Sequence, residues 1–120
     1  MTTDFFKAAA GWSVAETLVR LREAETDLVS EVSEIPVAGE SDQLVGVVPL
    51  VQLVRATPDD PLSGLIRPEL AAVTPGTPFG EVLEHFEKYH VRTLCVTDES
   101  GVLIGLISIE DVLKRLATAR

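Results

Sequence analysis

Ser108 and Asp111 are the two residues whose types and spacing are best suited to chemistry in this chain. They stand three positions apart at the start of a segment that reads as the last helix, from Ile109 to about Ala117. Taken alone, this spacing predicts a capping pair that satisfies amides of the first helical turn and stabilises the helix by about 1 kcal/mol. The same N-terminus also offers free N–H groups to an anion, and a carboxylate beside it suits a vicinal diol. The two roles can coexist.

The remaining reactive residue types give weaker signals. Arg92 could face a phosphate, or it could be a solvated cation at the end of a helix near Lys88. His85 and His90 are five positions apart, off the i,i+4 spacing of a metal pair. Cys95 lies between apolar residues and is predicted to be a small buried hydrophobe. The sequence has no glycine-rich phosphate loop, paired His and Cys, or nucleophile elbow, so an enzyme is not predicted.

Ser108 and Asp111 belong to the second copy of an internal duplication. Residues 94–111 align without a gap on residues 35–52, and the shift is 59 positions because Val37 matches Val96. The helical segments before them superpose with a shift of 65, which also places Met1 on Ile66. Pro49 and Gln52 therefore stand where the second copy has Ser108 and Asp111. Proline offers neither a hydroxyl nor an N–H group, so this corner is eroded in the first copy.

Each copy is predicted to be strand–helix–strand–strand–helix. Ser13 to Glu16 has the spacing of a capping box, and Thr77-Pro78 reads as a cap followed by proline at the first helical position. The first copy has six extra residues (65 against 59), which fall in the acidic stretch 23–34 and predict a longer helix end and loop. Two copies of about 60 residues would not be stable alone, so they should fold as one α+β module with pseudo-two-fold symmetry.

We divide the module into a first repeat (1–57), a linker (58–65) and a second repeat (66–120). The linker reads as ordered, because its apolar side chains can pack.

Charge and hydropathy exclude several classes of function. The net charge of −9, with no basic stripe, argues against a nucleic-acid partner. The longest apolar runs are strand-sized and far short of the ~20 residues of a membrane span, so direct membrane insertion is not expected. One cysteine and no signal peptide indicate a cytoplasmic location.

The order of motifs in the second copy resembles a CBS motif. The sequence Val73-Thr74-Pro75 precedes a helix, and residues 91–98, Gly101, residues 103–108 and residues 111–113 follow it. The whole chain, from Met1 to about Leu116, resembles a CBS pair, also called a Bateman module. Within this family, the lengths of the segments and the proline-rich linker of this chain resemble most the cytosolic CBS pair of MgtE-family magnesium transporters.

The resemblance implies a ligand site that uses Ser108 and Asp111. In such modules the hydroxyl contacts a ligand phosphate, and the aspartate accepts hydrogen bonds from ribose hydroxyls of an adenosyl compound (ATP, AMP or S-adenosylmethionine). The partner repeat's strands would hold the adenine, here around Ala9 and at Ser33, Ile35 and Pro36. Arg92 is the further phosphate-facing candidate, and the eroded corner would face residues 73–75 and 92–94.

The resemblance also implies a regulatory role. The module would form a homodimer through its helices and control an attached or partner transporter or enzyme, so that it could be the cytosolic part of a membrane transporter. A group of clustered carboxylates is interpreted mainly as a solvated acidic face. The alternative is weak binding of a hard cation, which makes Mg²⁺ a second candidate ligand. These carboxylates are Glu23, Glu25, Asp27, Glu31, Glu34, Asp59 and Asp60. No defined set of metal ligands is predicted. The alternative is a ligand-free structural dimerisation module with degenerate sites.

Overall fold

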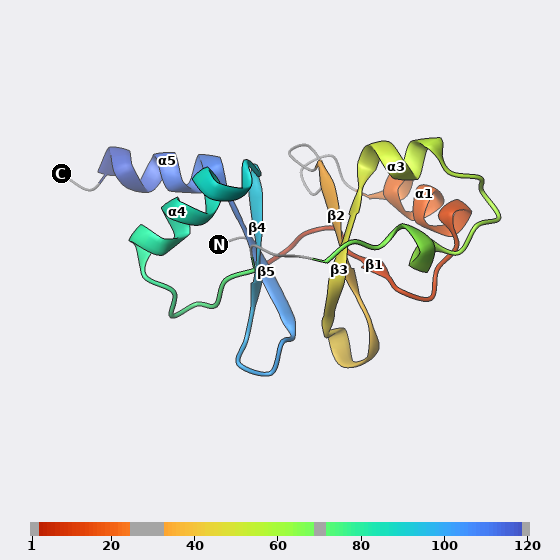
Figure 1. Ribbon diagram of the computed structural model, residues 1–120, viewed down its shortest axis with the longest axis horizontal. Helices are drawn as coiled ribbons and strands as arrows, with labels where there is room; N and C mark the ends of the chain where they lie inside the picture. Colours follow the sequence, from red (N-terminus) through yellow and green to blue (C-terminus); the bar gives the residue numbers. More distant parts are fainter. Residues whose placement is uncertain (1–2, 25–32, 69–71, 119–120) are drawn as a thin grey trace.

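The computed structural model describes residues 3–24, 33–68 and 72–118, which form two similar halves with their sheets back to back and their helices outside (Figure 1). The elements, in chain order, are β1 (Ala8–Ala9), α1 (Val14–Glu23), β2 (Glu34–Ala38), η1 (Glu40–Asp42), β3 (Leu44–Pro49), α3 (Leu50–Arg55), η2 (Leu62–Leu65), α4 (Phe79–Tyr89), β4 (Thr93–Thr97), β5 (Leu103–Ser108) and α5 (Ile109–Thr118). The predicted α+β class with two repeats is confirmed. The second repeat's leading strand is reduced to one parallel bridge between Val73 and Val96.

The two β-hairpins share one register. In the first, Val37 pairs with Gly46, and the ladder shifts at the next residue. In the second, the equivalent Val96 pairs with Gly105, and the same shift follows. Because a bulge is a specific local departure from the ladder, its repetition shows the duplication in three dimensions.

A shared apolar layer joins the two sheets. Its buried members are Val47 from β3, Cys95 from β4, and Leu103 and Leu106 from β5. Cys95 is buried, as predicted from its apolar neighbours. The amide of Leu44 also donates to the carbonyl of Gly101 across the hairpin ends, at 3.0 Å. The halves therefore pack as one unit.

Each sheet carries its own outer core beneath its helices. The first outer core centres on buried residues that include Val14, Ile35 and Leu53. Trp12 packs against it, with its ring centroid 6.5 Å from that of Phe6. The second outer core is built from α4, β4, β5 and α5.

The first helix of each repeat, α1 and α4, begins differently. The hydroxyl of Ser13 accepts from the amide of Glu16 at 3.1 Å, as the capping box predicts. The prediction for α4 was wrong by one residue, because Pro78 occupies the N-cap position and has no side-chain cap. The Thr77 hydroxyl instead accepts from the amide of Thr74, at 3.0 Å, so a tight local turn has taken the group that would have capped the helix.

The linker is ordered, as predicted. Leu62 is buried in the first outer core, and Leu65 and Ile66 pack against it. The longer helix end and loop predicted for residues 23–34 fall mostly on residues 25–32, outside the described part of the chain. The exact division at residues 57 and 65 stays a prediction. Among the described residues, no helix is long and apolar enough to cross a membrane.

Candidate functional site

Ser108 and Asp111 form a reciprocal cap at the junction of β5 and α5. The amide of Asp111 donates to the Ser108 hydroxyl oxygen at 3.1 Å, and the amide of Ser108 donates to Asp111 Oδ2 at 3.2 Å. The predicted capping pair is thus confirmed. Each side chain retains further capacity, because the hydroxyl can still donate its proton and the carboxylate has a second oxygen. Both residues are partly exposed.

Arg92 closes the same corner through its backbone. Its carbonyl accepts from the amide of Ile109, the first residue of α5, at 2.9 Å. The equivalent contact in the first repeat joins the carbonyl of Ser33 to the amide of Leu50, also at 2.9 Å. The structure therefore brings Arg92, Ser108 and Asp111 together, whereas Ser33 stands at the eroded corner of the first repeat.

The other predicted ligand contacts lie on β1 and β2. Ala9 pairs with Ala38, while Ile35 and Pro36 are buried and pair with Val48 and Val47. Their side chains are apolar, so they could meet a ligand's polar groups only through the backbone. None of these residues lines the cavity that reaches Asp111. Their part in binding stays a prediction.

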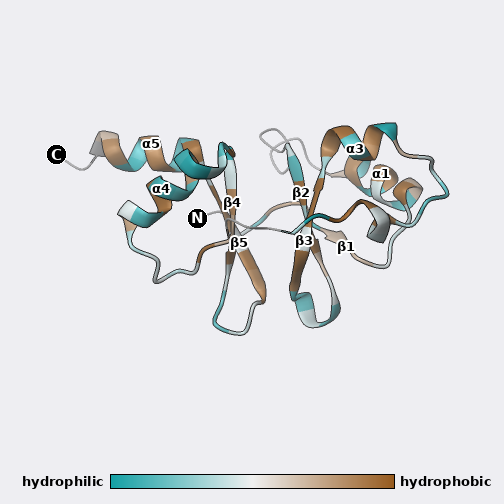
Figure 2. Cartoon of the chain, viewed as in Figure 1, coloured by the Kyte–Doolittle hydropathy of each residue, from teal (hydrophilic) through white to brown (hydrophobic). Residues whose placement is uncertain are grey.

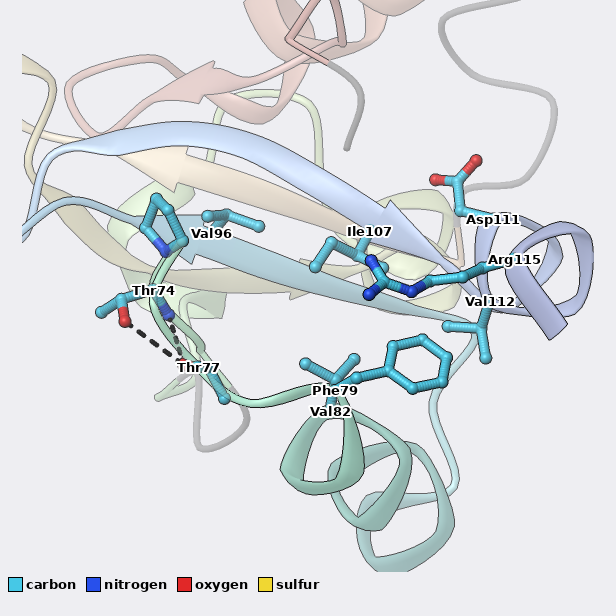
Figure 3. A pocket seen from close by; sticks show the side chains of 10 residues that line it. Thr74, Thr77, Phe79, Val82, Val96, Ile107, Asp111, Val112 and Arg115 are labelled. Carbon is cyan, nitrogen blue, oxygen red and sulfur yellow. Dashed lines mark hydrogen bonds between the residues drawn. The ribbon is translucent and has the colours of Figure 1, made fainter. Parts of the chain in front are cut away.

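A cavity of about 440 Å³ lies between α4, β4, β5 and α5 (Figure 3). Its lining residues are Thr74, Pro75, Thr77, Phe79, Val82, Val96, Ile107, Asp111, Val112 and Arg115. The guanidinium carbon of Arg115 lies 4.6 Å from the centroid of the Phe79 ring. Figure 3 shows the Asp111 carboxylate at the rim, directed away from Phe79 and Val112. The polar corner and the cavity therefore meet at Asp111, which belongs to both.

Sequence reasoning missed this cavity. Phe79 and Val82 lie three positions apart on the apolar face of α4, and this spacing does not say whether the space beside them is filled. The one available signal was Arg115, because a residue four positions after Asp111 lies on the same helical face.

The first repeat's corner differs in chemistry as predicted. Pro49 is the N-cap of α3 and provides no side-chain hydrogen bond. Gln52 lines a shallow hollow of about 370 Å³ together with Arg55, Ala56, Asp60 and Leu65. Asp60 is committed to local structure, since its Oδ2 accepts from the amide of Thr57 at 3.3 Å.

Residues that could hold a metal ion are sparse in the structure. Within residues 3–24, 33–68 and 72–118, no group of three or more His, Cys, Asp or Glu side chains is placed to bind one. Much of the acidic series named above lies at positions 25–32, outside the described residues.

Comparison with known proteins decides the family. The sequence model of the CBS domain matches residues 1–59 and again residues 62–118. This chain belongs to the CBS domain family. It is 32% identical over 113 residues to the magnesium transporter MgtE of Thermus thermophilus, covering 94% of the chain and 25% of that relative. It is also 32% identical over 102 residues to inosine-5'-monophosphate dehydrogenase of Aquifex aeolicus, covering 80% of the chain and 21% of the enzyme.

Solved structures agree with the sequence match. The cytosolic domain of the Mg²⁺ channel MgtE in complex with ATP superposes with a TM-score of 0.87 at 31% identity, covering 95% of this chain and 46% of that one. A CBS domain of the bacterial CNNM/CorC family Mg²⁺ transporter in complex with ATP shares the fold, with a TM-score of 0.75 at 21% identity, covering 95% and 80%. The resemblance to MgtE cytosolic CBS pairs is confirmed. The chain spans about a quarter of the length of the curated relatives named here.

Proposed function

We propose that this CBS pair is a regulatory module that binds an adenosyl nucleotide at the α5 corner and controls an attached transporter. The observation that carries the proposal is the intact corner made by Arg92, Ser108 and Asp111, opposite a first-repeat corner that has lost its hydroxyl and its carboxylate. The similar MgtE domain that was solved with ATP supports the choice of ligand class. One nucleotide per chain is expected.

The chemistry of the corner suits the two ends of such a ligand. The α5 N-terminus would favour phosphate charge, and so would the guanidinium of Arg92, whose backbone lies at this corner. The uncommitted oxygen of Asp111 can accept from ribose hydroxyls, while Oδ2 holds the carboxylate in place through the Ser108 amide. The backbone of Ala9, Ser33, Ile35 and Pro36 would contact the adenine.

Thermal unfolding with ATP, AMP, S-adenosylmethionine and Mg²⁺, each alone and combined, tests the proposal. A ligand at 100 times its Kd stabilises the folded chain by about 2.7 kcal/mol, which raises Tm by several degrees in a domain of this size. Asp111→Ala should abolish that rise, and Gln52→Ala at the eroded corner is the matched control and should keep it. Asp111→Asn separates charge from capping, because asparagine retains a side-chain oxygen. The proposal fails if no ligand shifts the wild-type Tm.

A ligand-free structural dimerisation module is the second candidate, and exposed apolar residues favour its dimer. Val51 and Val54 on α3 are 64% and 70% exposed, and Leu113 on α5 is 58% exposed. Figures 1 and 2 show α3 and α5 along the same edge, with apolar stretches on both. A homodimer through this edge is compatible with either function, so the ligand titration distinguishes the two.

The same proposal includes the cellular location of the module, the protein that it regulates and the role of Mg²⁺. The similar MgtE domain is described as cytosolic, so we place this module in the cytoplasm beside a membrane transporter. Mg²⁺ would bind with the phosphates of ATP or weakly on the acidic surface. Among the relatives are enzymes as well as transporters, and an enzyme effector would replace the transporter without changing the corner.

A further inference from the structure

The cavity beside α4 has a counterpart in the first repeat that the chain itself fills. Under the two repeat shifts, five of the wall residues correspond to residues of the first repeat that are fully buried. The pairs are Phe79 with Val14, Val82 with Thr17, Val96 with Val37, Ile107 with Val48, and Val112 with Leu53. Leu62 of η2 belongs to this first outer core and is 0% exposed, with Leu65 packed beside it. Among the described residues, the second outer core has no equivalent of Leu62.

The linker also satisfies the backbone at the start of α1. The carbonyl of Asp60 accepts from the amide of Val14, and the carbonyl of Pro58 accepts from the amide of Ala15, both at 2.9 Å. The amide of Leu62 donates in return to the carbonyl of Trp12, also at 2.9 Å. These bonds use amides that every helix N-terminus leaves without an intrahelical partner. The linker therefore contacts the first repeat through two backbone carbonyls that accept hydrogen bonds, one backbone amide that donates, and the buried side chain of Leu62.

The same three backbone groups line the corresponding place in the second repeat. They are the amides of Phe79 and Gly80 and the carbonyl of Thr77. The N-cap residue Pro78 provides no side-chain bond, and within the described residues no carbonyl accepts from these two amides. A methyl group added at Gly80 would meet no atom within 4 Å, so the space beside this turn is open.

We propose that this cavity is a docking slot for a leucine-bearing polypeptide turn, carried by the regulated protein and bound as η2 binds the first repeat. A peptide backbone supplies two carbonyls and an N–H group in the arrangement that the linker shows in the first repeat. Arg115 lines the cavity at the position where the first repeat has Ala56. Acidic residues ahead of the leucine, like Asp59 and Asp60 ahead of Leu62, would therefore meet a guanidinium. The assignment of this turn to the regulated protein rests on the proposed function, whereas the existence of the docking slot does not depend on it.

A synthetic peptide of residues 57–66 is the direct probe, since it is the chain's own example of the ligand. We expect saturable NMR shifts of the Thr77, Phe79 and Gly80 amides. The same peptide with Leu62→Ala should bind at least tenfold more weakly. In the protein, Pro78→Asp provides a side-chain acceptor for the first-turn amides and so competes with the peptide. This variant should raise Tm and weaken peptide binding at least fivefold, and the higher Tm would exclude unfolding as the cause.

A fusion keeps the proposal testable if the free peptide binds too weakly to measure. The shift of 65 carries Leu65 to the position just ahead of residue 1, so residues 57–65 are joined there. The high effective concentration should raise Tm by several degrees, and alanine at the fused leucine should remove the gain. The slot is refuted if neither peptide nor fusion has an effect, or if the alanine forms act equally well.

The two sites fail separately. Ser108→Ala should weaken the nucleotide-induced rise in Tm and leave peptide binding within twofold, because Ser108 belongs to the nucleotide corner and does not line the cavity. Peptide binding without any nucleotide response would uphold the slot and overturn nucleotide sensing. A nucleotide-induced rise in Tm, with no effect of the peptide or the fusion, would uphold nucleotide sensing and overturn the docking slot.

Discussion

Truncation of Leu62 to alanine should destabilise the whole module, although this residue lies in the connection between the repeats. Its side chain is 0% exposed within the first outer core. Leucine-to-alanine changes in cores cost about 2–5 kcal/mol. The turn beside it carries the exposed Ser63 and Gly64 and can partly collapse into the space, so we expect the lower half of that range, about 2.5 kcal/mol.

Calorimetry and guanidinium unfolding measure this cost. For a domain of 120 residues, about 4 °C is lost per kcal/mol, so Tm should fall by roughly 10 °C. The denaturant midpoint should fall while the slope m is unchanged. Leu113→Ala, at a position that is 58% exposed, is the matched control and should cost less than about 0.5 kcal/mol in dilute protein. A fall in Tm below about 3 °C for Leu62→Ala would refute the anchoring of the linker and, with it, the template for the slot.

Three further changes have expected outcomes. Gly46→Ala would place a methyl group against the carbonyl of Arg67 and should cost about 1–3 kcal/mol in chemical unfolding, whereas Gly64→Ala has open space and should cost almost nothing. Ser108→Ala removes one half of the reciprocal cap, and the free energy of unfolding should drop by about 1 kcal/mol without any ligand present. Val54→Asp should lower the molar mass seen by light scattering from dimer to monomer while the dilute Tm hardly changes, and an unchanged mass would place the dimer contact elsewhere.

Repetition made most of the fold predictable from the sequence. The strand-sized apolar runs and the caps at Ser13 and Ser108 are local signals, and each repeat supports the interpretation of the other. The failure at Thr77 shows the limit of such signals. A threonine three residues after Thr74 can close a turn or cap a helix, and the sequence does not rank the two.

The site was predictable only in its polar part. Ser108 and Asp111 are close in sequence, so their geometry follows from the helix start. The cavity depends on what fills a volume, and the walls of the filled and open versions are equally apolar. The difference arises because Leu62 is placed by the tertiary path of the linker, which no local pattern specifies.

The strand-like step at Arg67 has a mechanical consequence. Its amide and carbonyl both bond to Val47 of β3 at 2.8 Å, and a few residues later Val73 bonds to Cys95 and Thr97 in the other sheet. Arg67 is therefore bonded to the first half of the module and Val73 to the second. Separation of the two halves would expose the shared apolar layer of Val47, Cys95, Leu103 and Leu106 to water. We therefore expect the two halves to move as one unit, so that α3 and α5 keep their positions relative to each other.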